Sequence, residues 1–405
     1  MLYSYRLFDS IGDVDLAAWE KVRSEAGMPI FMDPRFIAAA ETSMKPECRF
    51  WYAIVYDGDG RAAACACVTR MTVDLADLAD ARVAWIIRRA PGVFSRFRKL
   101  KVMICGLPGS PGEKNLAMAS ASDSPRILPL LDRAICDLAE EDGMDVIAFK
   151  EFGQHDLEAM KPMLELGYRC IPSLPMHLFK PSFPDFSHYC AALKTRYRQQ
   201  INRSTRKLKN SGVVLSVLTD PEEILRVYTP QVHALYHQMV AKAELNLEVL
   251  PIDFFRQLTS RLSGEVELIA FSKDSTIIAF GWCLHASSTY TMLYAGLDYR
   301  LNDEFDLYFN LMYAGLDRAL RKGVSRIQIG QSASTFKARL GCYSEPLYVF
   351  AKGRGPLMSP LIRYGASLLI AEKPAPPASD IFKSGIAETM DDEKSVRSED
   401  GGSAA

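Results

Sequence analysis

A run of cationic side chains between Lys194 and Lys209 is well suited to bind an anionic group. Seven of these sixteen residues are Lys or Arg and none is acidic, namely Lys194, Arg196, Arg198, Arg203, Arg206, Lys207 and Lys209. Tyr197, Ile201 and Leu208 recur at helical spacing among them, which predicts a helix with a narrow apolar seam. Guanidinium groups on such a helix hold a phosphate or carboxylate through paired hydrogen bonds. A solvated helical face explains the same charges, and nucleic-acid binding, which weakens steeply with salt, is a rival use of them.

A second set of candidates for chemistry lies between residues 290 and 340. Asp298 follows an apolar strand, and a carboxylate near an apolar wall can have its pKa raised enough to act as a general base. Lys337 and Arg339 follow a turn at Gln331, where a cation could hold a phosphate or a developing oxyanion, although surface solvation accounts for them equally well. Tyr294 and Tyr308 are candidates to orient a substrate or donate a proton, but aromatic residues in such patterns more often belong to the core.

The elements that must position these residues occur twice in the same order. The first pass is predicted as strands Phe50–Tyr56, Ala62–Met71 and Val102–Cys105, helix Ile127–Glu141, strand Val146–Lys150, helix Asp156–Leu166 and strand Pro175–Lys180. The second is predicted as strands Val266–Phe271, Ile277–His285 and Ser288–Gly296, a helix closed by Gly323, strand Arg326–Ile329, helix Ser334–Leu340 and strand Pro346–Lys352. Two helices precede each pass, at Leu16–Glu25 and Pro34–Met44 and at Pro221–Ala243 and Pro251–Leu262. Duplication of one α/β unit explains this order, and chance similarity of generic elements is the alternative.

The sequence suggests four segments. Prolines at 172, 175, 181 and 184 end the first unit, which we place at residues 1–184. The basic helix forms a connector over residues 185–212, closed by Gly212, and the second unit covers residues 213–372. Residues 373–405 begin with a Pro-rich stretch and continue as an acidic, Ser- and Gly-rich tail, which we predict to be disordered.

Composition limits the classes of function. The net charge of -1 argues against a globally basic nucleic-acid binder, and 48% hydrophobic residues in 405 suffice for two cores. The nine cysteines are scattered, which is typical of reduced thiols in a cytoplasmic protein, and the close pair Cys65 and Cys67 lacks the partners of a metal site. No apolar run reaches the roughly 18 residues needed to span a bilayer, and the amino terminus does not resemble a signal peptide. We therefore expect a cytoplasmic protein without a bound metal.

Two segments and the order of elements carry a family resemblance. The segment Leu193–Arg203 (LKTRYRQQINR) and the segment Ile329–Gly341 (IGQSASTFKARLG), with the α/β order around them, resemble the GNAT acyltransferases. More narrowly, they resemble the Fem-type peptidyltransferases and related bacterial acetyltransferase-like proteins with tandem GNAT domains. The resemblance implies an α/β fold of two tandem GNAT-like units, each a mixed central sheet flanked by helices, with the first a degenerate copy that shapes the acceptor cleft.

The resemblance also implies an activity, the transfer of an acyl or aminoacyl group to an amine. Strands Tyr290–Gly296 and Arg326–Ile329 would splay apart and expose amides that polarise the acyl carbonyl. A helix beginning near Asp303 would receive the pyrophosphate of acyl-CoA, the expected co-substrate, with Arg300, Leu301, Asn302 and Arg339 as the residues nearest to it. However, Asp303, Glu304 and Asp306 depart from the family's Gly-rich loop and would repel phosphates. Fem-type members are associated with aminoacyl-tRNA, so tRNA is a further possible partner.

The expected acceptor is an amine on an anionic small molecule or glycan precursor, such as a cell-envelope or polysaccharide precursor. The predicted catalytic residues are Asp298, Lys337 and Tyr294, and the predicted substrate-binding residues are Lys194, Arg196, Arg198, Arg203, Tyr308 and Gln331. The competing interpretation is a non-catalytic GNAT-like module that uses the basic helix to hold a phosphate-bearing partner, and the acids at 303–306 favour it.

Overall fold

The chain forms two compact units, each assembled from three stretches of sequence. The computed structural model describes residues 3–45, 48–74, 76, 89, 99–242, 249–369 and 380–383. Unit 1 comprises Met1–Pro175, Lys242–Ser263 and Glu345–Lys373, and unit 2 comprises Met176–Ala241, Gly264–Ser344 and Pro374–Ala405. The linear division predicted at residues 184, 212 and 372 differs from this composition, because both units take up segments from elsewhere in the chain.

Unit 1 is built on a mixed sheet in the order β1-β2-β3-β4-β6-β15-β7, with β5 paired to β3. Its strands are β1 (Ser4–Phe8), β2 (Arg49–Tyr56), β3 (Ala62–Asp74), β4 (Lys99–Cys105), β5 (Leu116–Met118), β6 (Val146–Gly153), β7 (Arg169–Pro172) and β15 (Leu347–Gly353). Its helices are α1 (Leu16–Glu25), α2 (Pro34–Met44), α6 (Ser124–Glu141), α7 (Pro162–Glu165), α12 (Ile252–Arg261) and α16 (Gly355–Leu369), with 3-10 turns η1 (Ile11–Asp13), η2 (Ile30–Met32), η3 (Ala121–Asp123) and η4 (Gln154–Asp156). β4 and β6 run parallel, and the other strand pairs given for this sheet are antiparallel.

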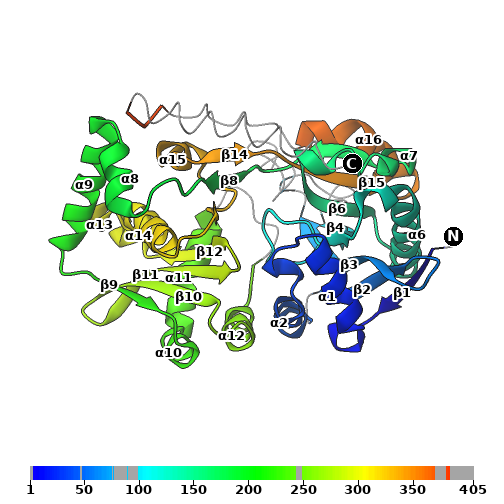
Figure 1. Cartoon of the computed structure of the whole chain (residues 1–405), viewed down its shortest axis with the longest axis horizontal. Helices are drawn as coiled ribbons and strands as arrows, with labels where there is room; N and C mark the ends of the chain where they lie inside the picture. Colours follow the sequence, from blue (N-terminus) through cyan, green and yellow to red (C-terminus); the bar gives the residue numbers. More distant parts are fainter. Residues whose placement is uncertain are drawn as a thin grey trace. The chain divides into compact units, whose positions relative to one another are not determined.

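Unit 2 repeats this plan in a sheet of order β14-β8-β13-β12-β11-β10-β9. Its strands are β8 (Met176–Phe179), β9 (Val214–Leu218), β10 (Val266–Lys273), β11 (Thr276–Ala286), β12 (Thr289–Leu297), β13 (Arg326–Gln328) and β14 (Tyr343–Glu345). Its helices are α8 (Phe186–Ala192), α9 (Thr195–Lys209), α10 (Pro221–Val227), α11 (Pro230–Lys242), α13 (Tyr299–Phe305), α14 (Leu307–Arg321) and α15 (Ser334–Arg339) (Figure 1). β12 and β13 form the parallel pair that corresponds to β4 and β6. The predicted α/β fold with two mixed sheets flanked by helices is confirmed.

The two units exchange one strand each, which the sequence did not predict. We predicted segments 175–180 and 346–352 as the last strands of their own units, and they do occupy matching places beside β13 and β6. However, β8 pairs with β13 in unit 2, at Ile327 with Phe179 and Gln328 with Leu178, whereas β15 pairs with β6 and β7 in unit 1. Like elements of a duplicated fold are interchangeable at low cost, because each finds the same kind of slot in either copy.

Three other predictions are corrected in detail. The predicted helix Pro221–Ala243 is two helices, α10 and α11, because Pro230 has no N–H to continue the first one and instead begins the second. Helix α12 belongs to unit 1, where Phe254 meets Phe36 of α2 with ring centroids 6.0 Å apart. Residues 380–383, predicted to be disordered, are ordered, because Ile381 and Phe382 are buried in the core of unit 2.

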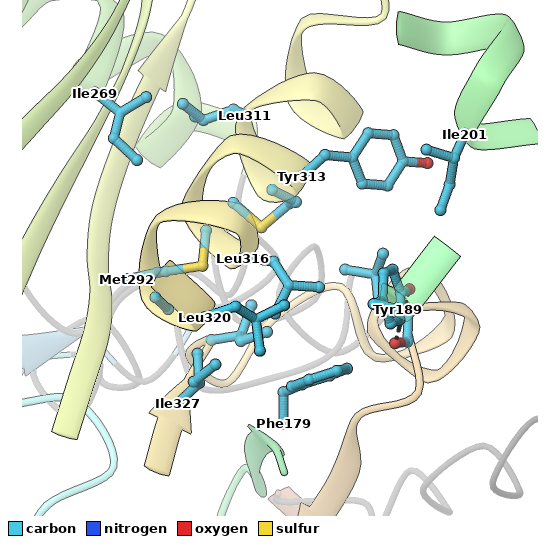
Figure 2. Packing of buried hydrophobic residues seen from close by; sticks show 14 of the residues in the cluster. Phe179, Tyr189, Ile201, Ile269, Met292, Leu311, Tyr313, Leu316, Leu320 and Ile327 are labelled. Carbon is cyan, nitrogen blue, oxygen red and sulfur yellow. Dashed lines mark hydrogen bonds between the residues drawn. The ribbon is translucent and has the colours of Figure 1, made fainter. Parts of the chain in front are cut away.

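The core of unit 2 lies between its sheet and α14. Leu316 and Leu320 lie one turn apart on α14, and Leu311 lies on the other side of the helix; all three are at most 3% exposed, so α14 is buried on more than one face. They pack with Ile269 of β10, Ile327 of β13 and other sheet residues in one cluster. Figure 2 shows Ile201 of α9 and Phe179 of the exchanged strand β8 among the buried residues around α14. The basic helix and β8 are therefore integral parts of unit 2.

Candidate functional site

The sheet of unit 2 opens between its two parallel strands, as the family resemblance implies. The ladder between β12 and β13 consists of Thr289 with Arg326, Tyr290 with Ile327 and Thr291 with Gln328. β12 then continues to Leu297, whereas β13 ends at Gln328. The register of β12 against β11 shifts by one residue where Met292 pairs with Cys283 and Tyr294 with Trp282, which is a bulge at the point of divergence. The predicted separation of these strands is confirmed.

Lys337 lies at the same end of β13 and is almost completely buried. The residue is 2% exposed on helix α15, and a Cβ built on Gly330 would lie 3.6 Å from its Nζ. Burial lowers the pKa of Lys337 from its ordinary value of 10.5 to about 7, while the thiol of Cys342 acts weakly in the opposite direction. Among the described residues, no ion pair or hydrogen bond holds this Nζ. Surface solvation, the alternative open from the sequence, is therefore excluded for Lys337.

His177 of the exchanged strand β8 connects the two ends of the segment that carries Lys337. Its Nε2 lies 2.9 Å from Ser334 Oγ, and its Nδ1 lies 3.0 Å from Ser344 Oγ. Burial and the nearby charge of Lys337 lower the pKa of His177 to about 4, so the ring is neutral at physiological pH. The sequence analysis missed this residue, although one His within the apolar run Met176–Phe179 was a usable signal.

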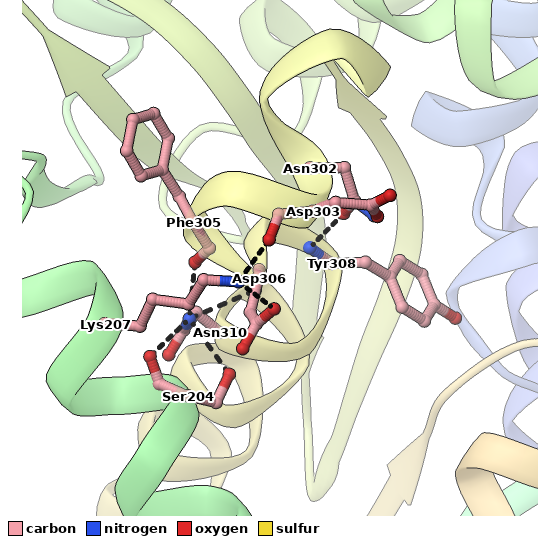
Figure 3. A network of polar contacts seen from close by, with 8 residues as sticks. All are labelled: Ser204, Lys207, Asn302, Asp303, Phe305, Asp306, Tyr308 and Asn310. Carbon is pink, nitrogen blue, oxygen red and sulfur yellow. Dashed lines mark hydrogen bonds and ion pairs between the residues drawn. The ribbon is translucent and has the colours of Figure 1, made fainter.

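The basic helix docks on the junction between α13 and α14, as Figure 3 shows. Lys207 Nζ lies 2.9 Å from Asp306 Oδ1 and also contacts the carbonyl oxygen of Asp303. The side-chain amide of Asn310 lies 3.0 Å from the carbonyl oxygens of Phe305 and Asp306 and 3.2 Å from that of Ser204 on α9. Of the three acids at positions 303, 304 and 306, Asp306 is thus paired through its carboxylate with the chain's own basic helix.

The first turns of both helices at this junction are already capped. The Tyr308 N–H of α14 donates to Asn302 Oδ1 at 3.1 Å, and Asp306 precedes the helix with a left-handed φ of 50°. The predicted start near Asp303 is wrong, since α13 begins at Tyr299 and breaks at Asp306. A pyrophosphate at either helix start would meet a carboxylate, of Asp298 or of Asp306, so these residues do not fit the usual placement of CoA.

Asp298 does not have the raised pKa that we predicted for a general base. It is the N-cap of α13, accepts the backbone N–H of Arg300 at 3.0 Å, and pairs with the Arg300 guanidinium at 3.0 and 2.7 Å. The hydrogen bond from the Arg300 side chain is the largest influence, and it holds the pKa of Asp298 below its ordinary value despite partial burial. Arg300, a predicted phosphate ligand, is 86% exposed at its side chain and engaged in this pair.

The other predicted donor-side residues lie on α13, α14 and the segment around α15. Leu301 and Asn302 are half-buried on α13, and Arg339 is exposed at the end of α15. Tyr308 packs against Phe336 of α15 with ring centroids 5.4 Å apart, and burial raises the pKa of its hydroxyl well above the ordinary range. Gln331 lies in the turn between β13 and α15, next to Gly330.

Tyr294 is half-buried beside the bulge in β12 and meets Tyr236 of α11 at 5.9 Å. The catalytic role of Tyr294 and the substrate-binding roles of Tyr308 and Gln331 remain predictions.

The predicted anion-binding residues share helix α9 but differ in what they contact. Lys194 forms an ion pair with Asp380, and Arg196 stacks on the ring of Tyr197 at 4.9 Å. Arg198 is half-buried, whereas Arg203 is exposed. Arg196 and Arg203 lie two turns apart on one helical face, which makes them the best placed of the four to meet a ligand from solution.

Two further features bear on the class of site. In the described part of the chain, no group of three or more His, Cys, Asp or Glu side chains is placed to hold a metal ion. Within the same residues, none of the helices has both the length and the apolar composition needed to cross a bilayer.

Comparisons with known proteins identify the domain that contains this site. Residues 195–338 match the family described as "Acetyltransferase (GNAT) domain". Two curated proteins from strains of Mycobacterium tuberculosis, each named "Putative 8-amino-7-oxononanoate synthase 2", are 26% identical over 314 residues, which cover 74% of this chain and 38% of the relative. The chain thus spans about two fifths of the length of these curated relatives.

Solved structures share the fold at low identity, each with a TM-score of 0.50. The C-terminal domain of a "Putative Lysylphosphatidylglycerol Synthetase" from Agrobacterium fabrum is 11% identical, with 84% of this chain and 92% of that chain covered. FemX is 12% identical, with coverage of 82% and 95%. A tandem GNAT protein from the clavulanic acid biosynthesis pathway is 10% identical, with coverage of 87% and 99%. Lys337 therefore lies within the segment that matches a GNAT acetyltransferase domain, and the chain shares its fold with a tandem GNAT protein, as the resemblance in the sequence implies.

Proposed function

We propose that unit 2 transfers an acyl or aminoacyl group from an activated ester or thioester to a primary amine on an anionic acceptor. The observation that carries this proposal is the buried amine of Lys337 at the end of β13, where β12 diverges. A lysine without a described counter-ion in the core destabilises the fold. Its presence at this position therefore suggests that the amine has another use. Its place beside the open end of the parallel pair suggests that this use is in the reaction.

The pKa of about 7 for Lys337 suits the amine for proton transfer near neutral pH. In the proposed reaction, the acceptor nitrogen attacks the acyl carbon, and its proton passes to the neutral Lys337 Nζ. The bond from the acyl carbon to the leaving oxygen or sulfur then breaks, and the leaving group takes up that proton. Backbone amides of β12 beyond Thr291 are the proposed donors to the developing oxyanion.

The donor is proposed to be an aminoacyl ester, with aminoacyl-tRNA as the corresponding partner. The carboxylates of Asp298 and Asp306 at the starts of α13 and α14 disfavour a pyrophosphate there, and Asn302 already accepts from the Tyr308 N–H. An aminoacyl ester needs no pyrophosphate site at these positions. Acyl-CoA remains the second candidate donor, because the matched family is described by acetyl transfer.

The acceptor is proposed to carry a phosphate or carboxylate that binds to α9. Arg196 and Arg203 are exposed on one face of this helix, while Ile201 and Ser204 fix the opposite face in the core. A small molecule or glycan precursor with an amine and an anionic group meets both requirements. Arg198 and Lys194 are the further proposed contacts, although Lys194 must first leave its pair with Asp380.

Unit 1 is proposed to be a degenerate copy that takes no part in the bond-making step. The ladder between β4 and β6 stays paired to the end of β4 at Cys105. Beyond it, the Lys150 side chain covers Gly106, because a Cβ there would lie 2.7 Å from Lys150 Cγ, and its Nζ donates to the carbonyl of Ser110 at 2.9 Å. The place that corresponds to the opening in unit 2 is therefore filled.

The test is a single-turnover assay of the whole chain with radiolabelled donors. Aminoacyl-tRNA and acetyl-CoA are each incubated with the protein and a pool of amine-bearing small molecules and cell-envelope precursors. We expect label from aminoacyl-tRNA to appear in an amide product, and the Lys337→Met variant to form it at least tenfold more slowly, which is about 1.4 kcal/mol of transition-state stabilisation. Product from acetyl-CoA alone would overturn the donor assignment, and no product from either donor would overturn the proposed function.

A further inference from the structure

A segment of four residues near the carboxyl end of the chain, Asp380 to Lys383, packs its two central side chains into the core of unit 2. Ile381 is 0% exposed and Phe382 is 9% exposed. The Phe382 ring lies 5.5 Å from the ring of Phe183 and 6.3 Å from that of Tyr189, measured between centroids. We call residues 380–383 the strap. Burial of two large apolar side chains stabilises the contact between this segment and the core that it joins.

The strap is joined by its backbone to the link between α8 and α9. The Lys194 N–H donates to the carbonyl of Ile381 at 2.8 Å, and the Lys383 N–H donates to the carbonyl of Ala192 at 3.0 Å. Leu193 and Phe382 form an antiparallel bridge between these two bonds. The strap therefore fixes the residue at which the basic helix begins.

The strap also covers the end of the helix that carries Lys337. Gly341 follows α15 with a φ of +85°, and a Cβ there would lie 2.9 Å from Ile381 Cδ1 and 3.0 Å from Phe382 Cζ. Only a glycine accommodates both the backbone conformation and this close contact. On the other side, the Cys342 N–H donates to the Lys337 carbonyl at 3.1 Å, so the contact is close to the buried lysine.

We propose that Ile381 and Phe382 are positioning residues for transfer, which hold α15 on the core so that Lys337 stays buried and in register with helix α9. This inference rests on the proposed function for its effect on rate, but its structural part stands on the contacts alone. Without the strap, the last turn of α15 and the first turn of α9 each lose an apolar cover, and water gains access to Lys337.

The charge state of Lys337 reports directly on this access. Burial is the main cause of its lowered pKa of about 7. The titratable groups that face it are Cys342, whose thiol pKa burial raises to about 12, and His177, whose pKa burial and the Lys337 charge lower to about 4. Both are neutral near pH 7, so a change in the Lys337 titration in that range reflects its solvation rather than a neighbour's charge.

The experiment compares an Ile381→Ala/Phe382→Ala double variant with an Asp380→Ala control in the full-length chain. Asp380 belongs to the same strap but contributes only an exposed ion pair to Lys194, and exposed ion pairs add little to stability. Competitive labelling of lysines with acetic anhydride across a pH series, read by mass spectrometry, gives the titration midpoint of Lys337. We expect a midpoint near the wild-type value in the control and a rise of at least one pH unit in the double variant.

Activity supplies the second readout. If Lys337 accepts the proton, kcat at pH 7 should fall about fivefold or more in the double variant, because a rise of one pH unit lowers the neutral fraction of Lys337 by that factor, and it should recover as the pH rises, with KM unchanged. A wild-type midpoint for Lys337 in the double variant would overturn the inference, as would an equal shift in the Asp380→Ala control. A third outcome is a shifted Lys337 midpoint in the double variant while the wild type transfers no acyl group. This outcome would support the positioning of Lys337 by the strap and contradict only the proposed function.

A second variant guards against general misfolding. The chain ending at Ser379 is prepared with and without a synthetic peptide of residues 376–387. We expect the truncated chain to show the raised Lys337 midpoint and the added peptide to restore the lower one. A peptide that binds without changing the Lys337 titration, or a truncated chain that keeps the wild-type midpoint, would each contradict a positioning role.

Discussion

Replacing Lys337 by Met should slow transfer at least tenfold and yet make the protein more stable at neutral pH. The pKa of Lys337 is about 7 in the folded chain against 10.5 as its ordinary value, which we take for the unfolded chain. Between these values, the unfolded chain binds one proton more than the folded chain, so the free energy of unfolding rises with pH across this window. Below pH 7 the full cost is present, and above the unfolded pKa it disappears.

The size of the effect follows from that difference. Each pKa unit corresponds to about 1.36 kcal/mol, so at pH 7 the lysine costs the folded state about 4 kcal/mol relative to a residue that does not titrate. Met has a similar length and no charge, and its thioether packs well in irregular apolar sites. We therefore expect Lys337→Met to raise the free energy of unfolding at pH 7 by up to about 4 kcal/mol and at pH 10 by much less.

Urea denaturation at pH 7 and at pH 10 measures both differences. The matched control is Arg339→Met, two positions along the same helix, where the side chain is exposed and no stabilisation is expected. A Lys337→Met protein that is less stable than the wild type at pH 7, or whose stability relative to the wild type does not depend on pH, would refute the buried, unpaired state. A stable but fully active variant would refute its role in transfer.

Two other perturbations test the remaining site assignments. Arg196→Ala combined with Arg203→Ala should raise KM for an anionic acceptor at least tenfold. The thermal unfolding midpoint should stay within about 2 °C of the wild-type value, since both side chains are exposed. Unchanged kinetics would remove α9 from the acceptor site. Asp298→Asn should retain more than a tenth of wild-type kcat. Asn also caps helices, and the native carboxylate is a poor base because its pKa is held low. A loss of a hundredfold or more in kcat would restore Asp298 as the catalytic base.

The order of elements could be predicted from the sequence because each half has its own periodicity and stop signals. The helices at Leu16–Glu25 and Pro34–Met44 have the predicted bounds, and Asp33 caps the second by accepting the Arg35 N–H at 2.8 Å. The exchange of β8 and β15 could not be predicted in this way. Both segments are short apolar strands with equivalent neighbours, so their patterns fit either sheet equally well, and only the tertiary contacts select one.

Asp298 illustrates why a site residue can be misassigned from a local pattern. Asp33 precedes α2 and pairs with the Arg35 guanidinium at 3.0 and 2.8 Å, and Asp298 precedes α13 and pairs with Arg300 in the same geometry. An Asp followed two residues later by Arg at a helix start therefore forms a charged cap in both units. Because Asp33 lies far from any predicted chemistry in the sequence, the shared geometry favours a structural role for Asp298.

Lys337 illustrates the opposite case. From the sequence, a lysine in the segment Ser334–Leu340 is as compatible with the surface as with a site, because a short helix has no periodicity long enough to define its buried face. The residues around its helix come from distant parts of the sequence, since His177 of β8 lies close enough to sense the charge of Lys337 and Tyr189 of α8 donates to the carbonyl of Leu340. Ile381 and Phe382 are a similar case. The composition of the sequence around them, residues 373–405, predicts disorder, although both residues bury their side chains.

The exchange of strands decides which part of the chain contains the candidate site. His177 lies on β8, before the predicted second unit begins, and contacts Ser334 and Ser344 around Lys337. A fragment of residues 213–372 would contain β15, which belongs to the other sheet, and would lack β8, α9 and the strap. The edge of β13 that pairs with β8 would then be open, at Ile327 and Gln328, directly before the turn that leads to Lys337. The residues of the candidate site are therefore all supplied by unit 2, and a fragment has to begin before β8 at Met176 and extend past residue 383 to contain them.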